Sequence, residues 1–88
     1  MVSRSVAVVN TLGLHARAAA RFVRVASGFR SSIKVSRGSR TTDGKSILGL
    51  LLLAAARGTQ IVIAVEGVDE AEALEALSGL AARGFEDP

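Results

Sequence analysis

The stretch Ile61-Val62-Ile63-Ala64-Val65 is apolar throughout and carries β-branched residues on both of its alternating faces. Such a stretch is typical of a strand in the middle of a sheet. Beyond it, Asp69 is expected to cap a helix, with Glu72 as the acid of a capping box. The expected buried stripe of that helix, which Gly84 would end, is Ala73, Leu74, Leu77, Leu80 and Ala81.

On the N-terminal side of this strand, strand patterns and helix patterns alternate. A short Val-rich strand is expected over residues 4–9, and a helix begins at Ala16 and is ended by Gly28. The expected apolar stripe of this helix is Ala16, Ala19, Ala20, Val23 and Ala26. The remaining elements are strands 33–37 and 40–42 around a type II′ turn at Gly38-Ser39, and an apolar helix over 47–55.

The resulting order, βαββαβα, predicts an α+β domain over residues 1–88, with one sheet and its helices on one face. The chain has no cysteine and a single histidine, so a disulfide framework, a zinc-thiolate site and a multi-histidine metal site are excluded. No cofactor or metal is expected. The longest apolar run, residues 50–56, is far too short to span a membrane. We therefore expect a soluble, cytoplasmic protein with no membrane partner.

The charges are distributed unevenly along the chain. Residues 1–45 carry nine Lys and Arg and one acidic residue, whereas residues 46–88 carry two Arg and seven acidic residues. This asymmetry favours a basic face that meets an anionic partner, although simple solubility also accounts for it. A small RNA-binding α/β module is one alternative. Such modules stack bases on aromatic side chains of a sheet, and the three aromatic residues, Phe22, Phe29 and Phe85, lie outside the predicted strands.

His15 and Arg17 stand at the expected start of the first helix, in the stretch Gly13-Leu14-His15-Ala16-Arg17. Unused backbone N–H groups at a helix N-terminus can bind an anion, including a phosphoryl group carried on the ring. The helix dipole disfavours the imidazolium form, so it keeps the imidazole nucleophilic. Arg17 can offer its planar fork of donors to phosphate oxygens. The simpler alternative is an ordinary exposed histidine beside a solvated arginine.

The same stretch resembles the active-site motif of the HPr family, the histidine-containing phosphocarriers of the phosphotransferase system. A second stretch, Gly44-Lys45-Ser46-Ile47-Leu48-Gly49, is similar to the regulatory-serine motif of that family. The resemblance implies an open-faced β-sandwich, with three helices on one face of a four-stranded antiparallel sheet. It also implies that His15 accepts a phosphoryl group on Nδ1 from enzyme I and donates it to an enzyme IIA-type acceptor, with Arg17 holding the phosphate. Ser46 would be phosphorylated by HPr kinase/phosphorylase, and the chain would be a carrier rather than an enzyme.

One residue departs from the common pattern of the family. Many members have proline directly after the arginine, where this chain has Ala18. Alanine is an excellent helix former at this position, so the local geometry is expected to survive. In this respect the chain resembles members that serve a nitrogen-related or regulatory phosphotransferase chain. A purely regulatory module that binds partners without relaying phosphate is a further alternative, which the presence of both His15 and Arg17 disfavours.

The apolar helix over residues 47–55 has more leucines than one buried face can hold. If Ile47, Leu50, Leu53 and Ala54 face the sheet, helical spacing turns another set outward: Leu48, Leu51 and Leu52. An exposed apolar patch beside basic residues predicts a docking surface for partner proteins, with Arg21 and Arg24 as its charged rim. The alternatives are that the helix is buried more deeply, or that leucine occurs here for its helix propensity.

Overall fold

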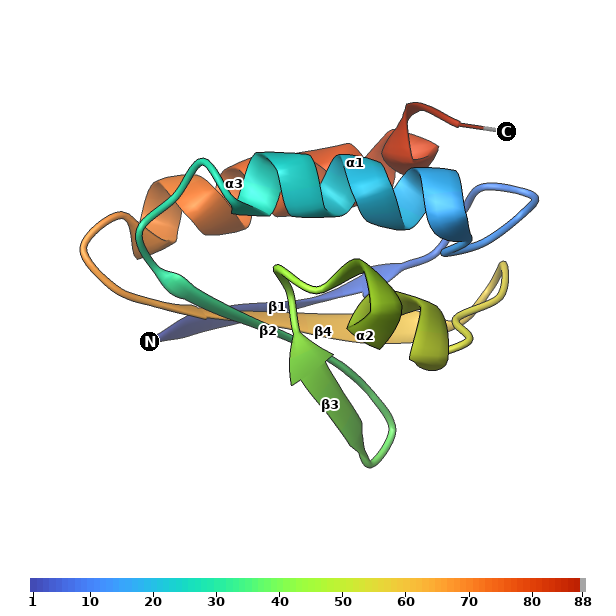
Figure 1. Cartoon of the computed structure of the whole chain (residues 1–88), viewed down its shortest axis with the longest axis horizontal. Helices are drawn as coiled ribbons and strands as arrows, with labels where there is room; N and C mark the ends of the chain where they lie inside the picture. Colours follow the sequence, from blue (N-terminus) through green and yellow to red (C-terminus); the bar gives the residue numbers. More distant parts are fainter. Residues whose placement is uncertain (88) are drawn as a thin grey trace.

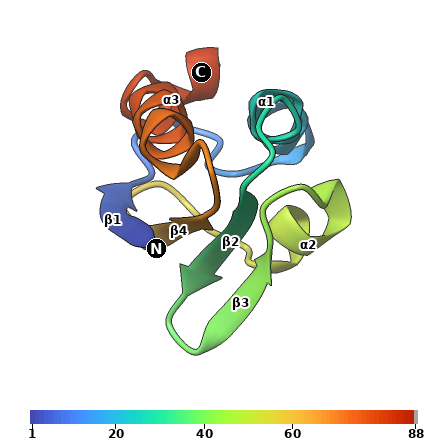
Figure 2. The same cartoon turned by 90° about the vertical axis from the view of Figure 1, so that its left-hand side faces the viewer.

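The predicted central strand lies inside a four-stranded antiparallel sheet, whose strands follow the order β1-β4-β2-β3. This computed structural model describes residues 1–87. Three helices cover one face of the sheet, and the opposite face is open (Figure 1 and Figure 2). The elements are β1 (Val2–Ala7), α1 (Ala16–Ala26), β2 (Ser32–Arg37), β3 (Arg40–Asp43), α2 (Ile47–Leu52), β4 (Gln60–Glu66), α3 (Glu70–Ala82) and a final 3-10 turn, η1 (Gly84–Glu86). The expected α+β, open-faced βαββαβα architecture is confirmed.

β4 is the central strand because it pairs with a neighbour along both of its edges. Val65 is opposite Val2 of β1 on one side and Ile33 of β2 on the other. Ile61, Ile63 and Val65 are fully buried beneath the helices, whereas Val62 on the open face is 39% exposed. Burial of large β-branched side chains on a single face therefore fixes the register of the sheet.

The two long helices, α1 and α3, lie side by side over the sheet (Figure 2). The expected stripe of α3 is buried at every position, from Ala73 to Ala81. The expected stripe of α1 is partly wrong: Ala16 is exposed, and Phe22, which the pattern left out, is 1% exposed. Phe22 has far more apolar surface to bury than an alanine, so it sets the rotation of α1. The buried residues of α1 are Ala18, Ala19, Phe22 and Ala26.

The predicted capping box at the start of α3 is not formed. Asp69 precedes the helix, but its carboxylate makes no cap hydrogen bond to it. The carboxylate instead accepts hydrogen bonds from the Ser31 hydroxyl at 2.5 Å and from the backbone N–H groups of Arg30 and Ser31 at 2.9 and 3.0 Å. The hydroxyl of Ser31 and the N–H of Arg30 lower the pKa of Asp69. Asp69 thus ties the start of α3 to the segment between α1 and β2.

Several boundaries differ from the sequence expectation. β1 runs from Val2 to Ala7 rather than over residues 4–9, because its ladder with β4 begins at the pair of Val2 and Val65. The two-residue turn at Gly38-Ser39 is confirmed, with Arg37 opposite Arg40 and a φ of +60° at Gly38. Gly28 and Gly84 lie two residues beyond the last residues of α1 and α3.

α2 ends at Leu52, three residues before the end expected from its apolar pattern. Leu53 is its C-cap, and Ala54 has a left-handed φ of +52°. Two arginines of the β2–β3 hairpin reach the last carbonyls of the helix: Arg37 Nε donates to Leu53 O at 2.6 Å, and Arg40 donates to Leu52 O at 3.0 Å. Cationic donors at a helix C-terminus satisfy carbonyls that the helix itself leaves unpaired. Tertiary contacts therefore decide where α2 ends.

Candidate functional site

His15 occupies the N-cap of α1, as expected from the sequence. Its backbone is extended, at φ −89° and ψ −175°, and its Nδ1 atom accepts a hydrogen bond from the Arg17 N–H at 3.4 Å. The ring is half-buried, with 26% of the side chain exposed. Nδ1 therefore faces the positive end of the helix, where backbone donors are available to an anion.

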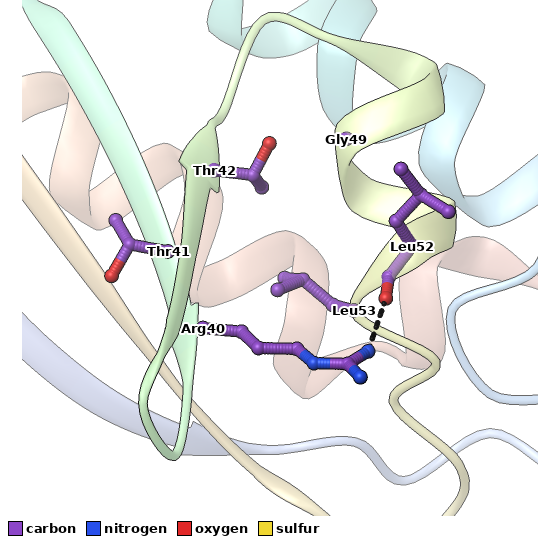
Figure 3. A pocket seen from close by; sticks show the side chains of 6 residues that line it. All are labelled: Arg40, Thr41, Thr42, Gly49, Leu52 and Leu53. Carbon is purple, nitrogen blue, oxygen red and sulfur yellow. Dashed lines mark hydrogen bonds between the residues drawn. The ribbon is translucent and has the colours of Figure 1, made fainter.

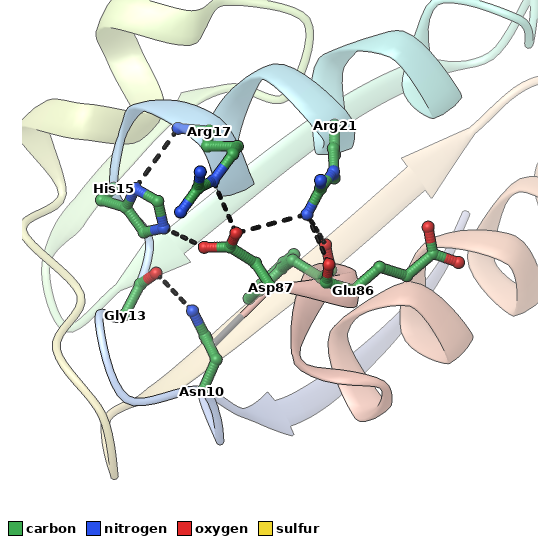
Figure 4. A network of polar contacts seen from close by, with 8 residues as sticks. Asn10, Gly13, His15, Arg17, Arg21, Glu86 and Asp87 are labelled. Carbon is green, nitrogen blue, oxygen red and sulfur yellow. Dashed lines mark hydrogen bonds and ion pairs between the residues drawn. The ribbon is translucent and has the colours of Figure 1, made fainter.

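The turn before His15 is held close to the loop that follows α2. Gly13 has a φ of +68°, and a side chain there would come within 2.6 Å of the carbonyl oxygen of Ala55. The next residue, Leu14, donates its N–H to the same oxygen at 2.9 Å. The Asn10 side chain donates to the carbonyl of Gly13 at 2.8 Å (Figure 4). Glycine at position 13 permits this close approach, which sets the position of His15.

A residue that the sequence analysis did not single out, Asp87, completes the site (Figure 4). Its carboxylate binds Nε2 of His15 and lies 2.6 Å from Nε of Arg17, and its side chain is only 2% exposed. Burial raises the pKa of Asp87, but the hydrogen bond with His15 and the charge of Arg17 outweigh burial, so the pKa lies below its usual value. Because Asp87 stands 72 residues after His15, no local pattern could reveal this contact.

Arg21 fastens the C-terminal turn to α1. One of its terminal nitrogens donates to the carbonyls of Phe85 and Glu86 at 3.2 and 2.5 Å and lies 3.4 Å from the Asp87 carboxylate. Its side chain is 32% exposed. Arg24 is exposed in the last turn of α1. Arg21 therefore has a structural role within the chain, and docking by Arg21 and Arg24 stays a prediction.

Ser46 is the N-cap of α2, directly before the first residue of the helix. Its hydroxyl accepts a hydrogen bond from the Gly49 N–H at 3.0 Å, and its backbone is extended. Gly49 packs so close to the Thr42 hydroxyl that a side chain at position 49 would overlap it. The helix cap explains the serine at position 46, and the close packing against Thr42 explains the glycine at position 49. Neither explanation depends on modification of Ser46.

The leucines of α2 divide differently from the sequence expectation. Leu48 and Leu52 are 67% and 64% exposed, whereas Leu51 is partly buried against the core. Leu50 and Leu53 are buried as expected, but Ile47 is 42% exposed and Ala54 is exposed. The expectation was wrong for both residues: Ile47 is exposed at the first position of α2, and Ala54 lies beyond the end of the helix at Leu52, with a left-handed φ of +52°. Leu48 and Leu52 form the exposed apolar patch of α2.

A hollow of about 400 Å³ lies between β3 and α2 (Figure 3). It is lined by Arg40, Thr41, Thr42, Gly49, Leu52 and Leu53. None of these residues belongs to the cluster around His15. Within residues 1–87, no three His, Cys, Asp or Glu side chains are grouped so that they could hold a metal ion. Over the same residues, none of the helices has the length and apolar character needed to cross a membrane.

Comparison with known proteins places the chain in a family. A family model described as the PTS HPr component phosphorylation site matches residues 2–83. A phosphocarrier protein HPr of Neisseria meningitidis is 48% identical over 80 residues, covering 91% of this chain and 90% of the relative. That of Cupriavidus necator is 44% identical over 85 residues, covering 97% and 96%. The crystal structure of HPr from Thermoanaerobacter tengcongensis superposes with a TM-score of 0.95 at 38% identity, covering 100% of this chain and 99% of that one.

The family model covers residues 2–83 and the structural match covers the whole chain, so both include the two stretches around His15 and Ser46. The matching family model and relatives are described as phosphocarriers rather than as catalytic enzymes. The chain therefore belongs to the HPr family, and it is a stoichiometric phosphoryl carrier of the phosphotransferase system rather than an enzyme.

Proposed function

We propose that His15 receives the phosphoryl group on Nδ1 from phosphorylated enzyme I and passes it to an enzyme IIA-type acceptor. One observation carries this proposal: Nδ1 faces the N-terminus of α1, where it accepts the Arg17 N–H, and the opposite nitrogen is held by a carboxylate. Donors of a helix N-terminus favour the phosphoryl dianion that forms there. Arg17, with 58% of its side chain exposed beside the ring, supplies a positive charge for the same oxygens.

The expected reaction can be tested with the full chain. Incubation with phosphoenolpyruvate, magnesium and the enzyme I of the host should give one phosphohistidine, mapped to His15. Phosphate on an imidazole nitrogen is labile in acid, which distinguishes it from phosphoserine. His15→Ala should abolish labelling and leave the fold intact, because this partly exposed residue lies outside the core. Labelling that persists in His15→Ala would overturn the proposal.

We infer a nitrogen-related or regulatory branch for this carrier from the residue after Arg17. Ala18 is fully buried in the first turn of α1, where many family members have proline. Rates of transfer to two acceptors, a IIA protein for sugar uptake and a IIA protein of a nitrogen-related chain, would test this inference. Faster transfer to the nitrogen-related acceptor supports it, and preference for the sugar acceptor contradicts it.

We further propose that Ser46 is a regulatory phosphorylation site for HPr kinase/phosphorylase. A phosphate at the N-cap of α2 is favoured by the exposed N–H groups and the dipole of the helix, so the fold should tolerate it. The added charge would lie next to the exposed apolar patch of Leu48 and Leu52. Docking of enzyme I on that patch would then require the new charge to lose its water.

The nucleic-acid alternative finds no support in the positions of the aromatic residues. Phe22 and Phe85 are buried in α1 and η1, and Phe29 is partly buried against the core. Among the described residues, the open face of the sheet therefore offers no aromatic side chain on which a base could stack.

A further inference from the structure

The C-terminal turn brings a carboxylate to the far side of the His15 ring. The side chain of Asp87 is 2% exposed, and its two oxygens have different partners: one binds Nε2 of His15, and the other lies 2.6 Å from Nε of Arg17. Figure 4 shows the carboxylate between the imidazole and the guanidinium. Both groups named in the phosphoryl-transfer proposal are therefore held by a third residue.

One nitrogen of the His15 ring faces a hydrogen-bond donor, and the other faces an acceptor. Nδ1 is 3.4 Å from the Arg17 N–H, which can only donate, so Nδ1 must present its lone pair. Nε2 faces the Asp87 carboxylate, which accepts when ionised, so Nε2 must present its proton. A neutral imidazole has one donor nitrogen and one acceptor nitrogen, and only the tautomer protonated on Nε2 satisfies both contacts.

We propose that Asp87 is a positioning residue that holds the His15 proton on Nε2, leaving the Nδ1 lone pair for attack on phosphorus. The inference rests on the phosphoryl-carrier function proposed above. A carboxylate that orients a histidine in this way sets both its tautomer and the direction of its reactive nitrogen.

In the transfer step one bond to phosphorus forms, one breaks, and the proton on Nε2 does not move. The Nδ1 lone pair forms the N–P bond, and the bond between phosphorus and the donor protein breaks with its electron pair returning to the donor. The proton stays on Nε2, so the phosphorylated ring is an imidazolium, and its positive charge faces the Asp87 carboxylate. Transfer to the acceptor reverses these changes, and a protonated ring leaves phosphorus more readily than a neutral one.

The position of Asp87 is fixed by the turn that carries it. Phe85 is fully buried with a φ of +57°, and Gly84 has a φ of +65°, so the chain reverses sharply after α3. Arg21 holds the carbonyls of Phe85 and Glu86. The charged groups that contact Asp87 in the described chain are Arg17 and Arg21 of α1 and the ring itself, and α2, which packs on α1, has no ionisable side chain.

The test compares Asp87→Ala with the matched control Glu86→Gln. Glu86 is the neighbouring carboxylate, but its side chain is 61% exposed, and within residues 1–87 its ion pair is with Arg83, at 3.6 Å. Nitrogen-15 NMR of the His15 ring at a pH where it is neutral reports the tautomer directly. Wild type and Glu86→Gln should show a proton on Nε2 and a bare Nδ1, and Asp87→Ala should show a mixture of both tautomers. This measurement needs no donor protein.

The rate of His15 phosphorylation by enzyme I is the second readout. Asp87→Ala should slow it by about tenfold to a hundredfold, the range seen when a histidine ligand of a metal loses its orienting partner. Asp87→Asn, which keeps an acceptor oxygen but no charge, should fall between Asp87→Ala and wild type. An unchanged tautomer in Asp87→Ala, or a rate equal to or above that of Glu86→Gln, would overturn the inference. If wild type accepted no phosphate, the carrier proposal would fail, and the inference with it, whatever tautomer NMR found.

Discussion

The sequence and the structure indicate different interaction partners for the Arg17 side chain. The sequence assigns it to the phosphoryl group, and the structure pairs its Nε with Asp87. Binding of the phosphoryl group and pairing with Asp87 are compatible, because a guanidinium has five N–H donors and the Asp87 contact is made by Nε, which carries one of them. An arginine whose guanidinium is already held by Asp87 loses less conformational freedom when it binds the phosphate.

We expect Arg17→Ala to slow phosphoryl transfer to and from His15 by about a hundredfold, the loss typical of removing one preorganised donor from a reacting centre. Its effect on folding should be small because the side chain is 58% exposed. Arg17→Lys keeps the charge and loses the fork, so it should recover only part of the rate. Stopped-flow transfer assays measure the rates. Equal rates for wild type, Arg17→Ala and Arg17→Lys would show that Arg17 pairs with Asp87 and takes no part in transfer.

The structure shows that Ser46 caps α2, and a regulatory effect of Ser46 requires a separate measurement. Ser46→Asp should slow phosphorylation of His15 by enzyme I, with a gap from wild type that narrows as salt screens the added charge. Ser46→Ala controls for loss of the hydrogen bond to Gly49 N–H and should transfer phosphate at the wild-type rate. If Ser46→Asp matched Ser46→Ala at low salt, the serine would be a cap with no regulatory effect.

Among the elements, α2 depends most on its surroundings. A helix of six residues is not stable alone, since the first turn costs more entropy than its hydrogen bonds return. Ser46 satisfies a donor at its beginning, and Arg37 and Arg40 satisfy acceptors at its end. The β2–β3 hairpin therefore holds the helix that carries the exposed apolar patch.

Arg37→Ala should lower the free energy of unfolding by about 1.5–3 kcal/mol, the usual value for a hydrogen bond to a charged group. The partly buried guanidinium of Arg37 donates to Leu53 O at 2.6 Å. Arg57→Ala, at an exposed arginine beyond α2, is the control and should change stability by less than about 0.5 kcal/mol. Denaturant unfolding measures both, and a loss no larger than that of the control would show that water replaces Arg37 at no cost.

Two carboxylates join distant parts of the whole molecule. Asp69 connects the start of α3 to the segment before β2, and Asp87 connects the C-terminal turn to α1. Both have a pKa below the ordinary value. A carboxyl whose pKa is lowered by folding adds stability above its unfolded pKa, and this stability is lost as pH falls through the folded pKa.

Stability should therefore fall as pH decreases from about 5 towards 3. Asp69→Asn should be less stable than wild type at pH 7 and should lose less of its remaining stability on acidification. Ser31→Ala removes the hydroxyl that contributes most to the lowered pKa of Asp69. The pH dependence of its stability should therefore lie between those of wild type and Asp69→Asn. Urea unfolding at several pH values measures the slopes. Parallel curves for the three proteins would show that Asp69 has no part in the acid response.

The elements and the two caps could be predicted because their signals lie within a few residues. The β-branched run of β4, the stripe of α3, and the placement of His15 and Ser46 before helices all follow from local periodicity and turn chemistry. Recognition of the two motifs added the family and the phosphoryl chemistry, which periodicity alone does not contain.

The remaining features depend on contacts between segments that are far apart in the chain. The rotation of α1 about Phe22, the end of α2 at the hairpin arginines, and the use of Asp69 as a tie rather than a cap follow from packing. The contact of Asp87 with His15 spans 72 residues. A sequence pattern records which side chains can donate, accept or be buried. Which distant partner each one meets is fixed only when the helices and the sheet have packed together and the burial of apolar surface has set their relative positions.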